Sequence, residues 1–157
     1  MEDIKRILVV SRMTKYSKKA VHYGISLAHK YGAKLYVTHV VYDPFGIEGW
    51  NLPMPSLEKD YQNLLIRERK ELDNMIAQEK QAGMDIEVAV REGEPTKEIL
   101  SIVKDERIDL VVLLAHEEGH LEHFLFGRSN EELIRRMPCS ILLVKKEPQP
   151  VTGPWEP

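Results

Sequence analysis

The stretch DLVVLLAH (residues 109–116) is followed by a polar loop, by GRSN (residues 127–130) and by a second apolar run, ILLV (residues 141–144). A buried strand, a glycine-bearing turn and a helix N-terminus therefore precede the next strand. The free N–H groups and the positive dipole end of such a helix favour an anion. Ser129 and Glu132 have the spacing of a capping box, which predicts that this helix starts near Ser129.

The alternation of strand and helix continues through the rest of the chain. Apolar, β-branched runs predict strands, and apolar positions at helical spacing predict the helices between them. Connections of this length cannot be hairpins, so we expect an α/β fold: a single-domain five-stranded parallel sheet with helices on both faces. The expected strands are 7–10, 35–41, 85–90, 108–114 and 140–145, and the expected helices are 15–32, 57–83, a segment after Pro95 and a segment after Ser129.

The length and composition suit one globular domain. We place an α/β domain at residues 1–146, with a long apolar loop at 43–56, and a proline-rich tail at 147–157. The net charge of −3 argues against a nucleic-acid partner. No apolar run approaches the length of a membrane span or forms a signal peptide, so we expect no membrane partner and a cytoplasmic location.

Parallel sheets of this kind bind ligands beyond the carboxyl ends of their strands, where the strand order reverses. Four predicted loops meet at that edge, at residues 11–14, 41–56, 91–95 and 115–129. We therefore expect the binding crevice there. The loop at 43–56 is interpreted as a lid or as a surface covered by a partner, because it carries several large apolar side chains.

Five segments, in order, resemble the universal stress protein family over residues 4–146. The resemblance implies a nucleotide-binding-type α/β fold. It also implies homodimers, often paired through the last strand, which here contains Ile141, Leu142, Leu143 and Val144. The matching segments are ILVVSRMTKYSKKAV (7–21), THVV (38–41), REGEPTKEIL (91–100), DLVVLLAH (109–116) and PCSILLVK (138–145).

The resemblance also bears on ATP, because only some members of that family bind it. Members that bind ATP carry Gly, two residues, Gly, nine residues, and then Gly followed by Ser or Thr. In this chain the three glycine positions hold Leu114, Glu117 and Gly127, and the next residue is Arg128. Binders also carry an Asp after the first strand, where this chain has Arg12. A side chain in place of glycine keeps the backbone away from phosphate, so the pattern is degenerate.

The chain nevertheless keeps groups that suit a nucleotide or anion crevice. Arg12 and Arg128 supply positive charge, and polar side chains remain at the start of the helix. The candidate ligand-binding residues are Arg12, Val41, Leu114, Glu117, Gly127, Arg128, Ser129 and Asn130.

We expect a homodimeric, non-enzymatic stress-response module with a degenerate nucleotide or anion crevice and no cofactor. Its partners would be a second copy, an unidentified protein and a small anion. The alternative is an ATP-binding, nucleotide-dependent switch with at most slow ATP hydrolysis.

The segment HEEGH (residues 116–120) matches the H-E-x-x-H pattern of zinc proteases. His116, His120 and His123 would share one face if the segment were helical. However, the match lies in a predicted loop with Gly119 inside it, and no downstream ligand has the spacing of these proteases. A solvated loop is the favoured interpretation, and a metal-binding hydrolase is the remote alternative.

Overall fold

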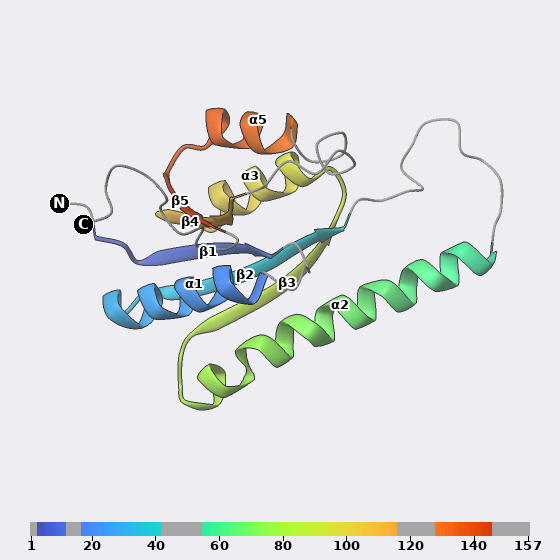
Figure 1. Cartoon of the computed structure of the whole chain (residues 1–157), viewed down its shortest axis with the longest axis horizontal. Coiled ribbons are helices and arrows are strands. Elements are labelled where there is room, and N and C mark those ends of the chain that lie inside the picture. The colour runs from blue at the N-terminus through green and yellow to red at the C-terminus, as the bar shows by residue number, and fades with distance from the viewer. Residues whose placement is uncertain (1–2, 12–16, 42–54, 116–127, 146–157) are drawn as a thin grey trace, which may run out of the picture.

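The computed structural model describes residues 3–11, 17–41, 55–115 and 128–145. Strands and helices alternate in the predicted order (Figure 1). The elements are β1 (Arg6–Ser11), α1 (Ser17–Tyr31), β2 (Lys34–Val41), α2 (Pro55–Gln81), β3 (Ile86–Glu92), α3 (Pro95–Asp105), β4 (Leu110–Leu114), α5 (Arg128–Arg136) and β5 (Ser140–Val144). The predicted loop at 43–56, except its last two residues, and the predicted tail at 147–157 lie outside the described residues.

The five strands form one parallel sheet in the order β3-β2-β1-β4-β5. This confirms the predicted fold class. The chain builds outward from β1 to β3, returns across the sheet, and then adds β4 and β5 on the other side of β1. The strand order therefore reverses between β1 and β4, which defines the position of the expected crevice.

Helices cover both faces of the sheet: α1 and α2 lie on one face, and α3 and α5 on the other (Figure 1). Alternate residues of each central strand point to opposite faces. In β1, Ile7 and Val9 pack beneath α1 and α2, whereas Leu8 and Val10 pack beneath α3 and α5. Both faces are therefore apolar, as expected for a parallel sheet covered on both sides.

Helix α1 lies very close to β1 at Gly24. A Cβ atom at this position would overlap Cγ2 of Val9, so only glycine permits this approach. The helix ends at Gly32, whose φ of 62° is the left-handed conformation that favours glycine. Tyr23 and Tyr31 occur at helical spacing with the buried Ala20 and Ala28, which would predict burial, yet they are 47% and 50% exposed.

Helix α2 buries Tyr61, Leu72 and Ile76. The charged run at residues 68–73 is typical of a solvated helix face. That interpretation is wrong for Glu68, which is only 7% exposed. Glu68 lies on the buried stripe, seven residues after Tyr61 and four before Leu72. Among the helices that the structure describes, none is long and apolar enough to cross a bilayer.

Candidate functional site

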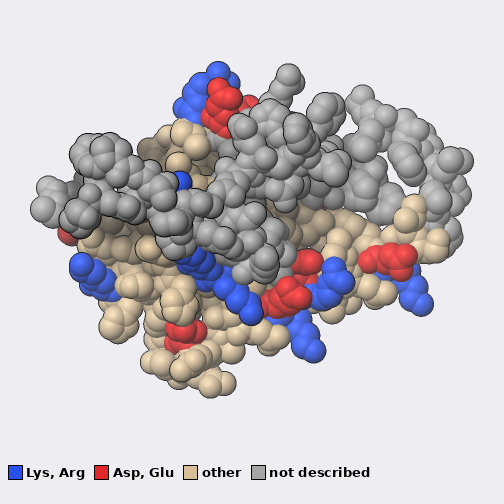
Figure 2. Space-filling model, viewed as in Figure 1, with Lys and Arg blue, Asp and Glu red and all other residues tan. Residues whose placement is uncertain are grey.

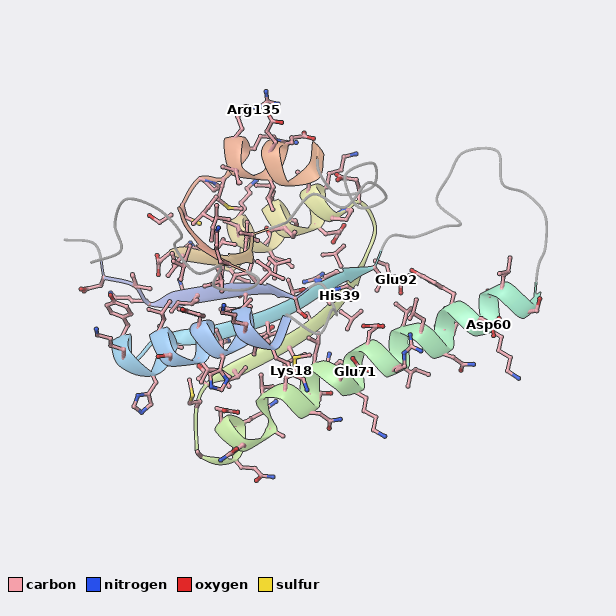
Figure 3. All side chains as sticks on the ribbon, viewed as in Figure 1. Lys18, His39, Asp60, Glu71, Glu92 and Arg135 are labelled. Atoms are coloured by element: carbon pink, nitrogen blue, oxygen red, sulfur yellow. The ribbon has the colours of Figure 1, made fainter. Side chains whose placement is uncertain are left out.

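The carboxyl ends of the strands meet along one edge of the sheet, around the switch point between β1 and β4. Ser11 ends β1, Val41 ends β2 and Leu114 ends β4. Register pairs Ser11 with His39 and Val41 with Glu92, so residues from three strands lie along this edge (Figure 3).

His39 fixes the end of β1. Its Nδ1 lies 2.7 Å from the main-chain oxygen of Ser11. A carbonyl oxygen only accepts hydrogen bonds, so Nδ1 carries the proton and donates it. The imidazole is half-buried and has a partner in the neighbouring strand. This agrees with a structural rather than a catalytic role for His39.

The end of β2 is tied to the turn after β3. The N–H of Gly93 donates to the main-chain oxygen of Val41 at 3.0 Å. Gly93 has a φ of 139°, which a residue with a side chain rarely adopts. The hydroxyl of Tyr61 in α2 donates to Glu92 at 3.2 Å. One main-chain acceptor of Val41, a predicted ligand residue, is thus engaged by the protein itself.

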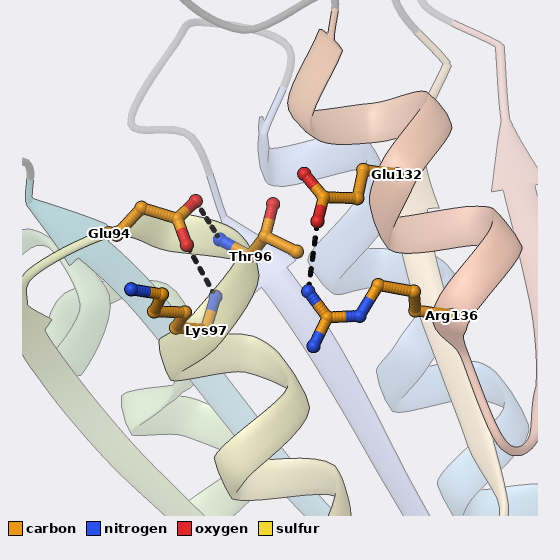
Figure 4. Close-up of polar contacts among 5 residues, drawn as sticks. All are labelled: Glu94, Thr96, Lys97, Glu132 and Arg136. Atoms are coloured by element: carbon orange, nitrogen blue, oxygen red, sulfur yellow. Dashed lines mark hydrogen bonds and ion pairs between the residues drawn. The ribbon is translucent and has the colours of Figure 1, made fainter.

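The N-terminus of α3 is capped by a residue that the sequence analysis did not select. The carboxylate of Glu94 accepts from the N–H of Thr96 at 3.0 Å and from the N–H of Lys97 at 3.1 Å (Figure 4). Pro95 begins this helix, as predicted. The chain's own negative charge therefore occupies the positive end of α3.

Helix α5 begins at Arg128, so Ser129 is its second residue and not the residue before it. The helix start predicted near Ser129 is therefore confirmed to within one residue, while the side chain of Ser129 lies outside the described residues. Glu132 accepts from Nη1 of Arg136 at 2.9 Å, one turn further along the helix (Figure 4). Helices α3 and α5 lie side by side. The strand predicted before this segment, β4, and the helix predicted after it, α5, are both confirmed.

Leu114 stands where the ATP-binding pattern of the family has its first glycine. Its side chain is 6% exposed and belongs to the core beneath α1 and α2, together with Val112 and Val144. The additional side chain therefore fills the core on this face. The sequence suggested that the Leu114 side chain obstructs a phosphate. Its packing in the core argues against this obstruction.

The remaining predicted site residues fall outside what the structure describes. The described residues include the backbone of α5 from Arg128 onward. Within the described ranges, no three His, Cys, Asp or Glu side chains form a group that could hold a metal ion. The residues outside are Arg12, Gly127 and Glu117 of the crevice, His116, His120 and His123 of the histidine segment, and the side chains of Arg128, Ser129 and Asn130.

The predicted dimer strand, β5, lies at an edge of the sheet and pairs only with β4 among the described strands. Val144 is buried, Ile141 and Leu142 are half-buried, and Leu143 is 50% exposed. The strand therefore presents an apolar side chain beside an open edge.

A doubly wound α/β sheet whose strand order reverses between β1 and β4 defines a nucleotide-binding type of fold. Residues 3–145 match the family model described as the universal stress protein family. The chain belongs to this family, which confirms the resemblance found in the sequence.

Individual relatives agree with this assignment. The chain is 29% identical over 147 residues to universal stress protein MJ0531 of Methanocaldococcus jannaschii, covering 90% of this chain and 82% of that protein. Its fold matches the solved structure of hypothetical protein MJ0577 with a TM-score of 0.72 and 21% identity, covering 94% and 100% of the two chains. A universal stress protein solved in complex with cAMP matches with a TM-score of 0.64 and 19% identity, covering 93% and 100%.

Proposed function

We propose that this universal stress protein works as a homodimeric, non-enzymatic, cytoplasmic module that senses a small anionic ligand. The ligand would bind in the crevice between the ends of β1 and β4. The observation that carries the proposal is the difference between two neighbouring helix N-termini. Glu94 caps α3 with a carboxylate, whereas α5 begins at Arg128 and places a positively charged residue type at its first position.

The comparisons support a phosphate-bearing ligand in this crevice. A family member with the same fold has been solved with cAMP. The fold brings Ser11, Val41 and Leu114 to the edge of the sheet at which doubly wound folds bind their ligands. Because the glycine pattern for a triphosphate is degenerate, we expect an anion or a nucleotide with few phosphates to bind better than ATP.

ATP remains the second candidate, as the ligand of a nucleotide-dependent switch. The observation in its favour is the packing of Leu114, whose side chain lies in the core beneath α1 and α2. Against it, one main-chain acceptor of Val41 is already engaged by Gly93. Binding measurements decide between the two candidates.

Calorimetry of the full chain with inorganic phosphate, cAMP and ATP with Mg²⁺ tests the proposal. Phosphate should bind with a millimolar dissociation constant, because dipole and charge contributions at an exposed helix start are each about 0.3–1 kcal/mol. ATP should bind no tighter than about 100 µM, or roughly 5.5 kcal/mol. Arg128→Gln, in the first turn of α5, should weaken phosphate binding, whereas Arg135→Gln, in the last turn, should not.

Three results would change the conclusion. A low-micromolar constant for ATP that weakens in Gly127→Val would establish the nucleotide switch. Release of phosphate from bound ATP, measured over hours, would contradict the non-enzymatic part of the proposal. Equal phosphate binding by Arg128→Gln and Arg135→Gln would reject the α5 site.

A further inference from the structure

A groove of about 490 Å³ runs between α1 and α2, on the face of the sheet opposite α3 and α5. The half-buried side chains of Ile25 and Met75 give the groove its apolar surface, above the buried Val21. Lys18 of α1 lies across the groove from Glu71 of α2 (Figure 3), and His22 also lines it. A second hollow of about 470 Å³ continues from it across α1 and shares Lys18 and His22.

The α1 side of this groove is positively charged in a chain that is negative as a whole. Residues 17–31 contain three lysines, two histidines and no acidic residue, whereas the net charge of the chain is −3. Figure 2 shows lysine groups over α1, and groups of both signs over α2. Lys18, Lys19 and His22 lie within little more than one turn, beside the half-exposed ring of Tyr23.

We infer that this groove is a docking site for an acidic amphipathic helix of a partner protein. The apolar face of such a helix would cover Ile25 and Met75, as in other helix-in-groove complexes. Its carboxylates would lie over Lys18, Lys19 and His22. Its lining residues all come from α1 and α2, and none of them is a predicted residue of the crevice between β1 and β4.

Glu71, on the α2 side of the groove, determines which flank of the partner helix can carry acidic residues. A carboxylate of the partner that approached α2 would meet a like charge, whereas the same carboxylate over α1 meets two lysines. The partner helix should therefore carry its acidic residues on the flank that faces α1. The same argument disfavours a uniformly anionic nucleic acid, which would extend over both walls.

The test uses the full ¹⁵N-labelled protein and two synthetic helical peptides of about 15–20 residues, a length at which isolated helices begin to be stable. Both peptides carry the same leucine face, one flanked by glutamates and the other by lysines. The acidic peptide should shift the amide signals of Lys18, His22 and Met75, and its binding should weaken as salt is added.

Matched charge-reversal variants distinguish binding in the groove from a general electrostatic attraction between the peptide and the protein. The double variant Lys18→Glu, Lys19→Glu should weaken the acidic peptide by about fivefold or more, the effect of roughly two exposed ion pairs. The control Lys59→Glu, Lys70→Glu, with the same change of charge on exposed positions of α2, should leave binding unchanged. The milder Lys18→Gln, Lys19→Gln variant should give a smaller loss if the reversal disturbs folding.

The inference is overturned by any of three results. These are equal binding of the lysine-flanked peptide, amide shifts that map outside α1 and α2, or no binding of the acidic peptide at millimolar concentration. A single-stranded oligonucleotide that binds the same lysines more tightly would reject the protein partner in favour of nucleic acid. Because phosphate binding at α5 is measured independently, failure here leaves the proposed function standing.

Discussion

The carboxylate of Glu68 lies 3.6 Å from the guanidinium of Arg67, yet the two side chains occupy different environments. Glu68 is buried on the inner stripe of α2, while the side chain of Arg67 is largely exposed. The second carboxylate oxygen of Glu68, Oε2, is buried without a hydrogen-bond partner. A buried charge with so little compensation lowers stability.

Glu68→Met should therefore stabilise the protein. Removing the uncompensated carboxylate and filling its volume with an apolar side chain is expected to raise the free energy of unfolding by about 1–2 kcal/mol. Urea denaturation at neutral pH measures the change. The control is Glu71→Met, at an exposed position three residues further along α2, which should change stability by less than about 0.5 kcal/mol. A clear loss of stability in Glu68→Met would show that the carboxylate has a partner that compensates its burial.

Gly24→Ala should destabilise the protein, although alanine normally favours a helix by about 1 kcal/mol. The new Cβ would overlap Val9, so α1 or β1 must shift, at an expected loss of about 1–3 kcal/mol. Thermal or urea unfolding provides the measurement. Ser26→Ala, on the exposed side of the same helix, should be neutral or slightly stabilising. In a Val9→Ala background the loss from Gly24→Ala should largely disappear, and an undiminished loss there would contradict the overlap.

The sequence predicted the strands and the helix ends well because their signals are local and strong. Buried β-branched runs, Gly32 and Gly83 at helix ends and Pro95 at a helix start each act within a few residues. The alternation of strands and helices predicted the fold class, and the family resemblance added the expectation that copies pair through the last strand.

The failures arose where a residue type does not reveal its environment. Glu68 has a charged side chain but occupies a buried position of α2. Tyr23 and Tyr31 have apolar rings, yet both side chains are about half exposed. Glu94 was missed as a cap because glutamate is not among the preferred capping residues. Its signal was its position directly before Pro95.

Cys139 should react slowly with alkylating agents. Burial, followed by the negative charge of Asp109, raises the pKa of the thiol above its ordinary value. Less thiolate is therefore present at a given pH, and the iodoacetamide rate should reach half its maximum above about pH 8.5, the value of a free cysteine. The protein unfolded in urea is the control and should show the ordinary midpoint.

The raised pKa of Cys139 also makes the stability of the protein depend on pH. The unfolded chain loses the thiol proton at lower pH than the folded chain, so stability from this group is constant below the unfolded pKa and falls as pH rises above it. Asp109→Asn should lower the folded pKa without returning it to the ordinary value, because burial remains. A folded midpoint below that of the unfolded protein would contradict the burial of Cys139.

The two edges of the sheet differ in a way that predicts how copies assemble. At β3, Glu87 forms an ion pair with Lys34 at 3.0 Å, and Arg91 and Glu92 are exposed, so the edge carries charges that discourage pairing. The residues of β5, Ser140–Val144, include no charged side chain. We therefore expect pairing through β5.

Leu143→Glu should consequently abolish the dimer that we propose. The exposed leucine would become a carboxylate within the proposed interface, where its desolvation and the like charge contributed by the second copy both oppose association. Light scattering at micromolar concentration should give twice 18.2 kDa for the unaltered chain and 18.2 kDa for the variant. Ile66→Glu, at an exposed apolar position on α2, is the control and should keep the dimer mass. A mass of 18.2 kDa for the unaltered chain would reject the dimer. Dissociation by Ile66→Glu, with Leu143→Glu still dimeric, would move the interface from β5 to α2.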